Sequence, residues 1–280
     1  MATVYFFNGT QSGTADGSYA DPYDLSSLAS QESASSSGDV FIFKDGTYTQ
    51  TSDLTLAGTN GITYQAESPL GATLDLNAFQ LTTGSNALFD MTVKNLRLVG
   101  FKDTSVGIQT LANQSHKVFF EGCYIESDAT NSSTSGIIGY QQTLTTLGLR
   151  ATFRRCAMKL YNTSAGEAFY HRTTAPSHPF LELDSCSISV NVSGGLTSLT
   201  QNVDTFIIKN TIIYGDTNAV NGLGTNSSLT ESNNCYYNVT GESADPANGI
   251  IVDDPQFVDF ANGDLRLRPT SPCIGAGTAS

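Results

Sequence analysis

The chain has 280 residues, 39% of them hydrophobic, so it is long enough to bury a sizeable core. Only 14% are charged, and a net charge of −13 argues against nucleic acid and anionic membrane surfaces as partners, because both are themselves negatively charged. Ser, Thr, Asn and Gly fill the polar positions, a composition that favours strands and tight turns over long helices.

The first 38 residues predict a module that closes one end of the fold. The stretch TVYFF (3–7) has the residues of a strand and is followed by a turn-rich segment. Residues 24–34 predict a short helix with Asp24 as its N-cap. The start of the sequence lacks the features of a signal peptide, and no apolar run has the length needed to cross a bilayer.

Strand-like stretches follow from residue 38 onward, and six later segments share one local pattern. The first residue is apolar in every segment except the last, which begins with Ser232. Two mostly polar residues follow, then a small or apolar fourth residue, and the sixth residue is apolar. The segments are VKNLRLVG (93–100), FEGCYIES (120–127), FRRCAMKL (153–160), LDSCSISV (183–190), IKNTIIYG (208–215) and SNNCYYNV (232–239). A constant pattern at varying intervals indicates a parallel β-solenoid, whose coils stack about 4.8 Å apart and align equivalent positions in rows.

The fourth position of the pattern carries four of the five cysteines. It reads Leu96, Cys123, Cys156, Cys186, Thr211 and Cys235. A buried thiol packs as a small apolar group, and one row of equivalent positions offers no specific disulfide pairing. Metal, redox and nucleophile roles are the alternatives, although no CxxC or His-rich spacing indicates zinc. We therefore predict that the four cysteines are reduced core residues on one interior face.

Charged residues occupy the position directly after the first residue of the pattern. That row reads Lys94, Glu121, Arg154, Asp184, Lys209 and Asn233. Opposite charges alternate from coil to coil, so they can pair across neighbouring strands, and Glu126 beside Lys159 forms a similar pair. We interpret the row as a solvated ladder that fixes register and contributes little stability per pair.

The two ends of the chain carry a family resemblance. GDVFIFKDGTYT (38–49) and, more specifically, DDPQFVDFANGDLRLRPTSPCIGAG (253–277) resemble the ends of right-handed parallel β-helix proteins of the pectin-lyase-like superfamily. The resemblance implies an all-β, single-stranded right-handed parallel β-helix with a short N-terminal capping helix and a C-terminal cap. We expect one domain, with a cap at 1–38, coils at 39–247 and a second cap at 248–280. Such caps occur on lyases, glycosidases, adhesins and proteins without known activity, so they do not select a function.

One segment gathers candidate catalytic groups, GEAFYHRTTAPSHP (166–179). In polysaccharide lyases of this fold a basic residue abstracts a proton, and Ca²⁺ or a second basic group neutralises the acid, whereas the related hydrolases use clustered carboxylates. If the chain is an enzyme, Arg172 or His171 is the candidate base and Glu167 the candidate acid or cation ligand. The alternative is an ordinary exposed turn inserted on the flank of the solenoid.

Tyrosines supply candidate sugar contacts. The chain has 12 Tyr, 15 Phe and no Trp, and the pattern places Tyr124, Tyr214 and Tyr236 at outward positions. Rings beside amides and hydroxyls suit stacking against sugars, so the carbohydrate-binding candidates are Tyr161, Tyr170 and Tyr214. The β-propensity of Tyr explains its place beside strands equally well.

Two classes of function stay open. The first is an extracellular-type or phage virion surface protein (tail spike, fibre or capsid decoration) whose flank contacts a polysaccharide or surface glycan. Other virion proteins are its further expected partners, and a homotrimer is one expected assembly. The second is a polysaccharide lyase or glycoside hydrolase acting on an acidic polysaccharide. We expect no metal site and no cofactor, Ca²⁺ entering only with a lyase, no nucleic-acid or membrane partner, and a virion or extracellular location.

Overall fold

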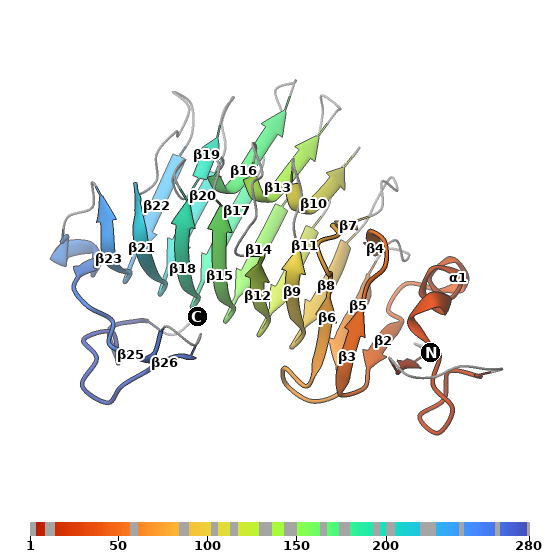
Figure 1. The fold of residues 1–280 in the computed structure, drawn as a ribbon. Helices are drawn as coiled ribbons and strands as arrows, with labels where there is room; N and C mark the ends of the chain where they lie inside the picture. The colour runs from red at the N-terminus through yellow and green to blue at the C-terminus, as the bar shows by residue number, and fades with distance from the viewer. Residues whose placement is uncertain are drawn as a thin grey trace.

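The structure is an all-β right-handed parallel β-helix, in which the chain passes in turn through three parallel sheets (Figure 1). This confirms the fold class expected from the repeats. No helix in the described part of the chain has the length and apolar character of a membrane span. The computed structural model describes residues 4–8, 15–56, 61–83, 90–101, 106–112, 117–128, 136–142, 150–162, 167–173, 180–192, 197–199, 205–218, 228–240, 244–260 and 264–278.

Each sheet stacks equivalent strands of successive coils. The first sheet runs β1 (Val4–Phe7), β2 (Val40–Phe43), β5 (Ile62–Ala66), β8 (Asp90–Lys94), β11 (Lys117–Glu121), β14 (Arg150–Arg154), β17 (Phe180–Asp184), β20 (Thr205–Lys209), β22 (Ser228–Ser232). The second runs β3 (Gly46–Thr49), β6 (Ala72–Asp75), β9 (Arg97–Phe101), β12 (Tyr124–Ser127), β15 (Ala157–Asn162), β18 (Ser187–Val192), β21 (Ile212–Asn218), β23 (Cys235–Thr240), β24 (Ile251–Val252). The third runs β4 (Leu54–Leu56), β7 (Leu81–Thr83), β10 (Val106–Ala112), β13 (Gly136–Gln142), β16 (Glu167–Thr173), β19 (Thr197–Leu199).

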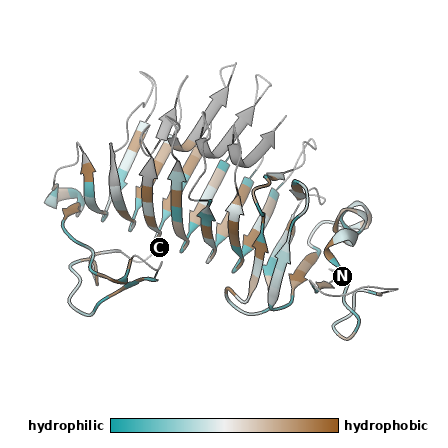
Figure 2. Ribbon diagram, in the orientation of Figure 1, coloured by the Kyte–Doolittle hydropathy of each residue, from teal (hydrophilic) through white to brown (hydrophobic). Residues whose placement is uncertain are grey.

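Alternation along the strands separates core from surface. In the first sheet, β14 reads exposed, buried, intermediate, buried, intermediate, and its neighbours follow the same period of two. Figure 2 shows the result as alternating hydrophobic and hydrophilic residues along these strands. The inward rows stack like on like: the rings of Phe120 and Phe153, paired in register, lie 4.8 Å apart and nearly parallel.

A tight corner joins the first sheet to the second at the equivalent structural position of each coil. The corner residue has a positive φ, between 52° and 64°, in every aligned coil: Asn95, Gly122, Arg155, Ser185, Asn210 and Asn233. Gly and Asn adopt this left-handed conformation at low cost, which explains their recurrence there. The corners are also bonded to one another, for example from the Gly122 amide to the Arg154 carbonyl at 3.0 Å.

The residue after the corner forms the predicted interior row for Cys123, Cys156 and Cys186. All three are buried, and their thiols are free. Each Sγ donates to a carbonyl oxygen of the preceding coil: Cys123 to Val93 at 3.4 Å, Cys156 to Phe120 at 3.6 Å and Cys186 to Phe153 at 3.3 Å. Thr211 and Asn234 continue the row by donating to Leu183 and Ile208. The row therefore satisfies backbone carbonyls as well as filling space.

The predicted place of Cys235 in that row is wrong. Cys235 pairs in register with Ile212, at an outward position of the second sheet, and Asn234 takes the interior place. The same shift of one residue turns Tyr236 inward, where it is buried, although the pattern predicted that it points outward. The corner explains the shift, because Asn233 and Asn210 both hold the positive-φ conformation and must align.

The N-terminal module contains the short helix expected there, although the stretch from 24 to 34 divides into a 3-10 turn and an α-helix. Its helix α1 (Leu28–Ala34) follows a 3-10 turn, η1 (Leu25–Ser27), and the Asp24 carboxylate caps that turn by accepting from the Ser27 amide at 3.0 Å. Leu28 and Glu32 are buried, and the Tyr64 hydroxyl donates to the Glu32 carboxylate at 2.5 Å. The module therefore packs onto the first coils at one end of the solenoid (Figure 1).

The C-terminal part has two components. A 3-10 turn, η2 (Pro246–Asn248), leads to Ile250, which belongs to the main core. An antiparallel hairpin follows, β25 (Phe257–Asp259) and β26 (Asp264–Leu267), and it lies beside the last strands of the second sheet (Figure 1). Its apolar side covers outward residues of that sheet in a second cluster: Ile212, Cys235, Phe257 and Leu265.

Candidate functional site

The outer side of the first sheet presents a group of charged and aromatic side chains that we call the charged face. These residues take the outward register positions of β8, β11, β14, β17 and β20, so adjacent coils hold them at strand spacing. The charged face consists of Lys94, Phe119, Glu121, Arg150, Thr152, Arg154, Phe180, Glu182, Asp184 and Lys209.

Ion pairs run along the charged face in the predicted register. Lys94 pairs with Glu121 at 3.3 Å, and Arg154 pairs with Asp184 at 3.1 Å. At the far end the structure differs from the prediction, because Ser232 rather than Asn233 lies beside Lys209. Away from the charged face, the expected contact of Glu126 with Lys159 is present at 3.4 Å. The alternation of charge is therefore a real feature of the fold.

Asp184 corrects the interpretation of this row as a solvated ladder, since its side chain is 0% exposed. It accepts hydrogen bonds from Arg154 Nε at 3.1 Å and from the Ser185 hydroxyl at 2.9 Å, and Lys209 Nζ lies 3.6 Å away. A carboxylate buried this fully needs such donors to offset its lost hydration. Asp184 therefore holds the side chains of Arg154 and Lys209 close together.

Glu182 lies on the same face of β17 as Asp184 and forms the shorter ion pair with Lys209. Lys209 Nζ is 2.7 Å from its carboxylate, and the Thr152 hydroxyl is 3.4 Å away. The hydrogen bond to Glu182 raises the pKa of Lys209, and the charges of Glu182 and Asp184 act in the same direction. Lys209 therefore holds its proton more firmly than a free lysine does.

Two aromatic rings complete the charged face. The Arg150 guanidinium lies 4.2 Å from the centre of the Phe180 ring, its register partner on the next coil, and Arg154 lies 5.6 Å from the Phe119 ring. Both rings are half-buried. A ring with an arginine over it is held in place and keeps an apolar edge beside fixed hydrogen-bond donors.

This arrangement suits binding better than proton transfer. A general base must be able to lose its proton near the working pH, and Lys209 is shifted away from that condition. The guanidinium groups of Arg150 and Arg154 carry hydrogen-bond donors and no acceptors, so they suit contact with hydroxyl oxygens. Within the described residues, no group of three or more His, Cys, Asp and Glu side chains is placed to hold a metal ion. The Ca²⁺ that would accompany a lyase stays a prediction.

The segment singled out for catalysis is a strand in the third sheet. Glu167, Tyr170, His171 and Arg172 lie on β16, so the expectation of an exposed turn or insertion is wrong for residues 167–173. In register, Tyr170 lies between Gly139 and Ser198. The side chains of these four residues lie outside the described part of the structure, as does His178, and their proposed roles stay predictions.

The tyrosines named for sugar contact occupy different settings. Tyr161 is half-buried at the end of β15, with Lys159 Nζ 5.9 Å from its ring. Tyr214 lies on the outer side of the second sheet, but its ring contacts Phe260 of the C-terminal hairpin at 4.0 Å. Tyr124 is outward in register yet buried, because Arg97 covers its ring at 4.4 Å. Tyr214 and Tyr124 therefore contribute packing.

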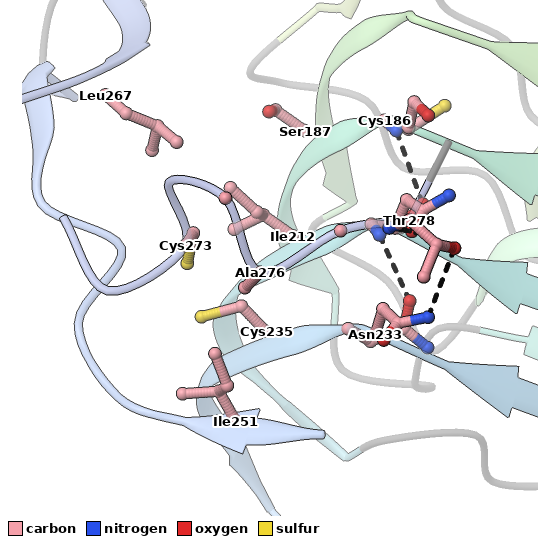
Figure 3. A pocket seen from close by; sticks show the side chains of 16 residues that line it. Cys186, Ser187, Ile212, Asn233, Cys235, Ile251, Leu267, Cys273, Ala276 and Thr278 are labelled. Atoms are coloured by element: carbon pink, nitrogen blue, oxygen red, sulfur yellow. Dashed lines mark hydrogen bonds between the residues drawn. The ribbon is translucent and has the colours of Figure 1, made fainter. Parts of the chain in front are cut away.

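A concave region of about 490 Å³ lies at the corner of the last coils, where the C-terminal segment crosses the second sheet (Figure 3). Its polar wall contains Asn210 and Asn233. Thr278 bonds to both of them: its amide donates to Asn210 Oδ1 at 2.8 Å, and its hydroxyl oxygen accepts from Asn233 Nδ2 at 3.4 Å. Its other wall contains Cys235 and Cys273.

The comparisons with solved structures agree on the fold. A pectate lyase is 14% identical over 99% of this chain and 92% of its own, with a TM-score of 0.51. A pectin methylesterase from Erwinia chrysanthemi is 12% identical over 90% of this chain and 94% of its own, with a TM-score of 0.50. No protein-family model matches the chain, and no curated protein matches its sequence. At these identities the likeness shows the right-handed parallel β-helix fold.

The sequence contains residues of the charged face that the six aligned segments do not include. Arg154, Asp184 and Lys209 were aligned correctly, but were interpreted only as surface charges. Phe119 and Phe180 were not singled out, although both lie at outward positions of strands that precede the repeats. Extending the six aligned segments by a few residues toward their N-termini would have placed these rings beside the charges.

Proposed function

We propose that the protein binds a polysaccharide along the charged face and does not cleave it there. The observation that carries the proposal is the combination of two ring–arginine pairs with fixed donors on one rigid sheet. Sugar rings present apolar faces and hydroxyl groups, which such a surface can contact together. The raised pKa of Lys209 supports binding over proton abstraction.

The charge of the protein limits the class of glycan that it can bind. A net charge of −13 repels a densely anionic polymer, and Glu121, Glu182 and Asp184 already pair with three cations of the charged face, Lys94, Lys209 and Arg154. The glycan class that fits is rich in hydroxyl groups and carries little net negative charge. Binding to such a glycan should depend weakly on salt.

Glycan binding by Phe180→Ala and Arg150→Ala tests the proposal. Wild-type protein is screened on a glycan array that includes neutral and uronate polymers, and Kd for the best ligand is measured by calorimetry. Each substitution should raise Kd about tenfold, because it removes one half of a ring–arginine pair worth roughly 1.4 kcal/mol in binding. Val258→Ala and Arg266→Ala are the matched controls, since they remove an exposed apolar group and an exposed arginine from the C-terminal hairpin. An unchanged Kd in both test variants would contradict the proposal.

A polysaccharide lyase or glycoside hydrolase is the second candidate, favoured by the fold shared with a pectate lyase and a pectin methylesterase. Its candidate groups lie on β16. A lyase should generate unsaturated product from a uronate polymer, seen as ultraviolet absorbance, whereas a hydrolase should release new reducing ends. The combined change Tyr170→Ala, His171→Ala, Arg172→Ala should abolish either signal. Lys209→Gln is the control that should keep the activity. No product from wild-type protein, with binding retained, supports binding alone.

The setting on a phage virion or outside the cell belongs to the same proposal, with other virion proteins and a homotrimer as expected partners. Light scattering of the purified chain gives its mass, and a monomer at working concentration would argue against the trimer.

A further inference from the structure

Two cysteines from distant parts of the chain lie at one concave site. Cys235 begins β23 at an outward position and is 3% exposed, and Cys273 lies in the turn that follows β26 and is half-buried. Both line the region at the corner of the last coils, and Figure 3 shows their sulfur atoms on the same side, turned toward one another. Both thiols are free in this structure.

The remaining three cysteines have a different setting. Cys123, Cys156 and Cys186 lie in the main core, and each thiol donates to backbone carbonyls of its own and the preceding coil. Cys186 reaches the concave region only as one of its lining residues. Cys235 and Cys273 belong instead to the smaller cluster formed with the C-terminal hairpin. The argument that one row offers no specific disulfide pairing does not extend to them.

The fold holds this pair of cysteines together without a covalent bond. The segment after Cys273 is tied to the last coils through Thr278, as described above. The Cys235 thiol also donates to the Asp253 carbonyl at 3.4 Å, and Phe257 and Leu265 pack beside it. The two cysteines therefore lie in one packed cluster at the same site, where a bond between their sulfur atoms would join the hairpin to the last coil.

The two thiols also differ in reactivity. The contact with the Cys235 side chain lowers the pKa of Cys273, and the same contact together with burial raises the pKa of Cys235. The thiolate is the nucleophile in thiol–disulfide exchange. The more exposed cysteine is thus the one that reacts first.

We propose that Cys235 and Cys273 are a redox modification site, which a small-molecule disulfide such as oxidised glutathione converts into an intramolecular disulfide. The Cys273 thiolate attacks one sulfur of the oxidant, giving a mixed disulfide and one released thiol. Cys235 then loses its proton and attacks the Cys273 sulfur, which forms the protein disulfide and releases the second thiol. The protein loses two electrons and two protons, and the oxidant is reduced to two thiols.

The disulfide would fasten the C-terminal hairpin to the last coil. It closes the loop between Cys235 and Cys273, so it restricts the unfolded chain more than the folded one. The melting temperature of the oxidised protein should rise by roughly 5–10 °C. The effect does not depend on glycan binding, because the charged face lies on a different sheet.

Oxidation of native full-length protein tests this site. The protein is incubated with excess oxidised glutathione, and its peptides are mapped by mass spectrometry without reduction, beside a melting curve. We expect a crosslinked peptide that joins Cys235 to Cys273, unmodified Cys123 and Cys156, and the higher melting temperature, reversed by a reductant. Cys273→Ser should show neither the crosslink nor the shift.

Cys235→Ser supplies the second test, because it should trap glutathione on Cys273 as a stable mixed disulfide. If Cys235→Ser does not fold, the test rests on comparing wild-type protein with Cys273→Ser. A crosslink that uses Cys186, a stable mixed disulfide on Cys273 in wild-type protein, or a crosslinked protein that melts no higher than the reduced one would overturn the proposal.

Discussion

Replacing Cys186 by aspartate should lower the free energy of unfolding by at least about 3 kcal/mol at neutral pH, or prevent folding. Cys186 is 1% exposed, and its sulfur faces two carbonyl oxygens, those of Phe153 at 3.3 Å and Asp184 at 3.5 Å. A carboxylate there would meet acceptors where it needs donors. Chemical denaturation followed by circular dichroism measures the loss.

The acid form of that aspartate can donate, which gives the prediction a pH dependence. Burial raises the pKa of the introduced carboxyl above its unfolded value of about 4. The deficit relative to wild-type protein at the same pH should therefore be smallest below about pH 4 and grow as the pH rises through the folded pKa.

Cys186→Thr is the matched control for this position. Thr211 already occupies the next place in the interior row, and its hydroxyl donates to the Leu183 carbonyl at 3.4 Å and to the Lys209 carbonyl at 2.8 Å. The control should cost less than about 1.5 kcal/mol, because the donor and nearly the same volume are kept. Equal stability of the aspartate and threonine variants at neutral pH would show that position 186 is not enclosed as described.

The coil architecture could be predicted because the same residue types recur wherever the backbone makes the same demand. In most coils an apolar residue lies two places before the corner, a polar or charged residue directly before it and a small donor directly after it, and these positions repeat with the stacking of the coils. The capping role of Asp24 could also be predicted, since capping depends on local sequence alone.

The register of the last coil could not be obtained from residue identity. The shared cysteine favoured aligning Cys235 with Cys186, whereas the backbone requires Asn233 to take the positive-φ corner in line with Asn210. A shift of one residue moves every side chain to the other face of a strand. The C-terminal hairpin then covers Cys235, so an outward position of the second sheet becomes buried by residues far along the chain.

Part of the candidate site was visible in the sequence and part was not. The alternation of Arg154, Asp184 and Lys209 gave the neighbours correctly. The complete burial of Asp184 had no signal in the local pattern, because it results from the side chains of adjacent coils closing over it. The aligned rows of a solenoid predict which residues are adjacent. The burial of each residue in a row depends on the side chains that surround it.

Replacing Asp184 by alanine should lower the free energy of unfolding by about 2–3 kcal/mol. The substitution leaves Arg154 and the Ser185 hydroxyl without an acceptor that the fold supplies now, although Lys209 keeps its contact with Glu182. The loss stays below that of a fully buried pair, because the Arg154 side chain is 33% exposed and water can reach it.

A double-mutant cycle isolates the contact itself, and the same row provides its control. Coupling between Arg154→Ala and Asp184→Ala should be about 1–3 kcal/mol and nearly independent of salt, because one partner is fully buried. The cycle for Lys94 and Glu121, whose side chains are 39% and 24% exposed, should give less than about 1 kcal/mol and weaken as salt is added. Equal couplings in the two cycles would mean that the burial of Asp184 adds nothing, and that the row is the solvated ladder its sequence first indicated. A larger, salt-resistant coupling at Arg154 and Asp184 would identify this pair as the structural anchor of the charged face, since it fixes the arginine that lies beside Phe119.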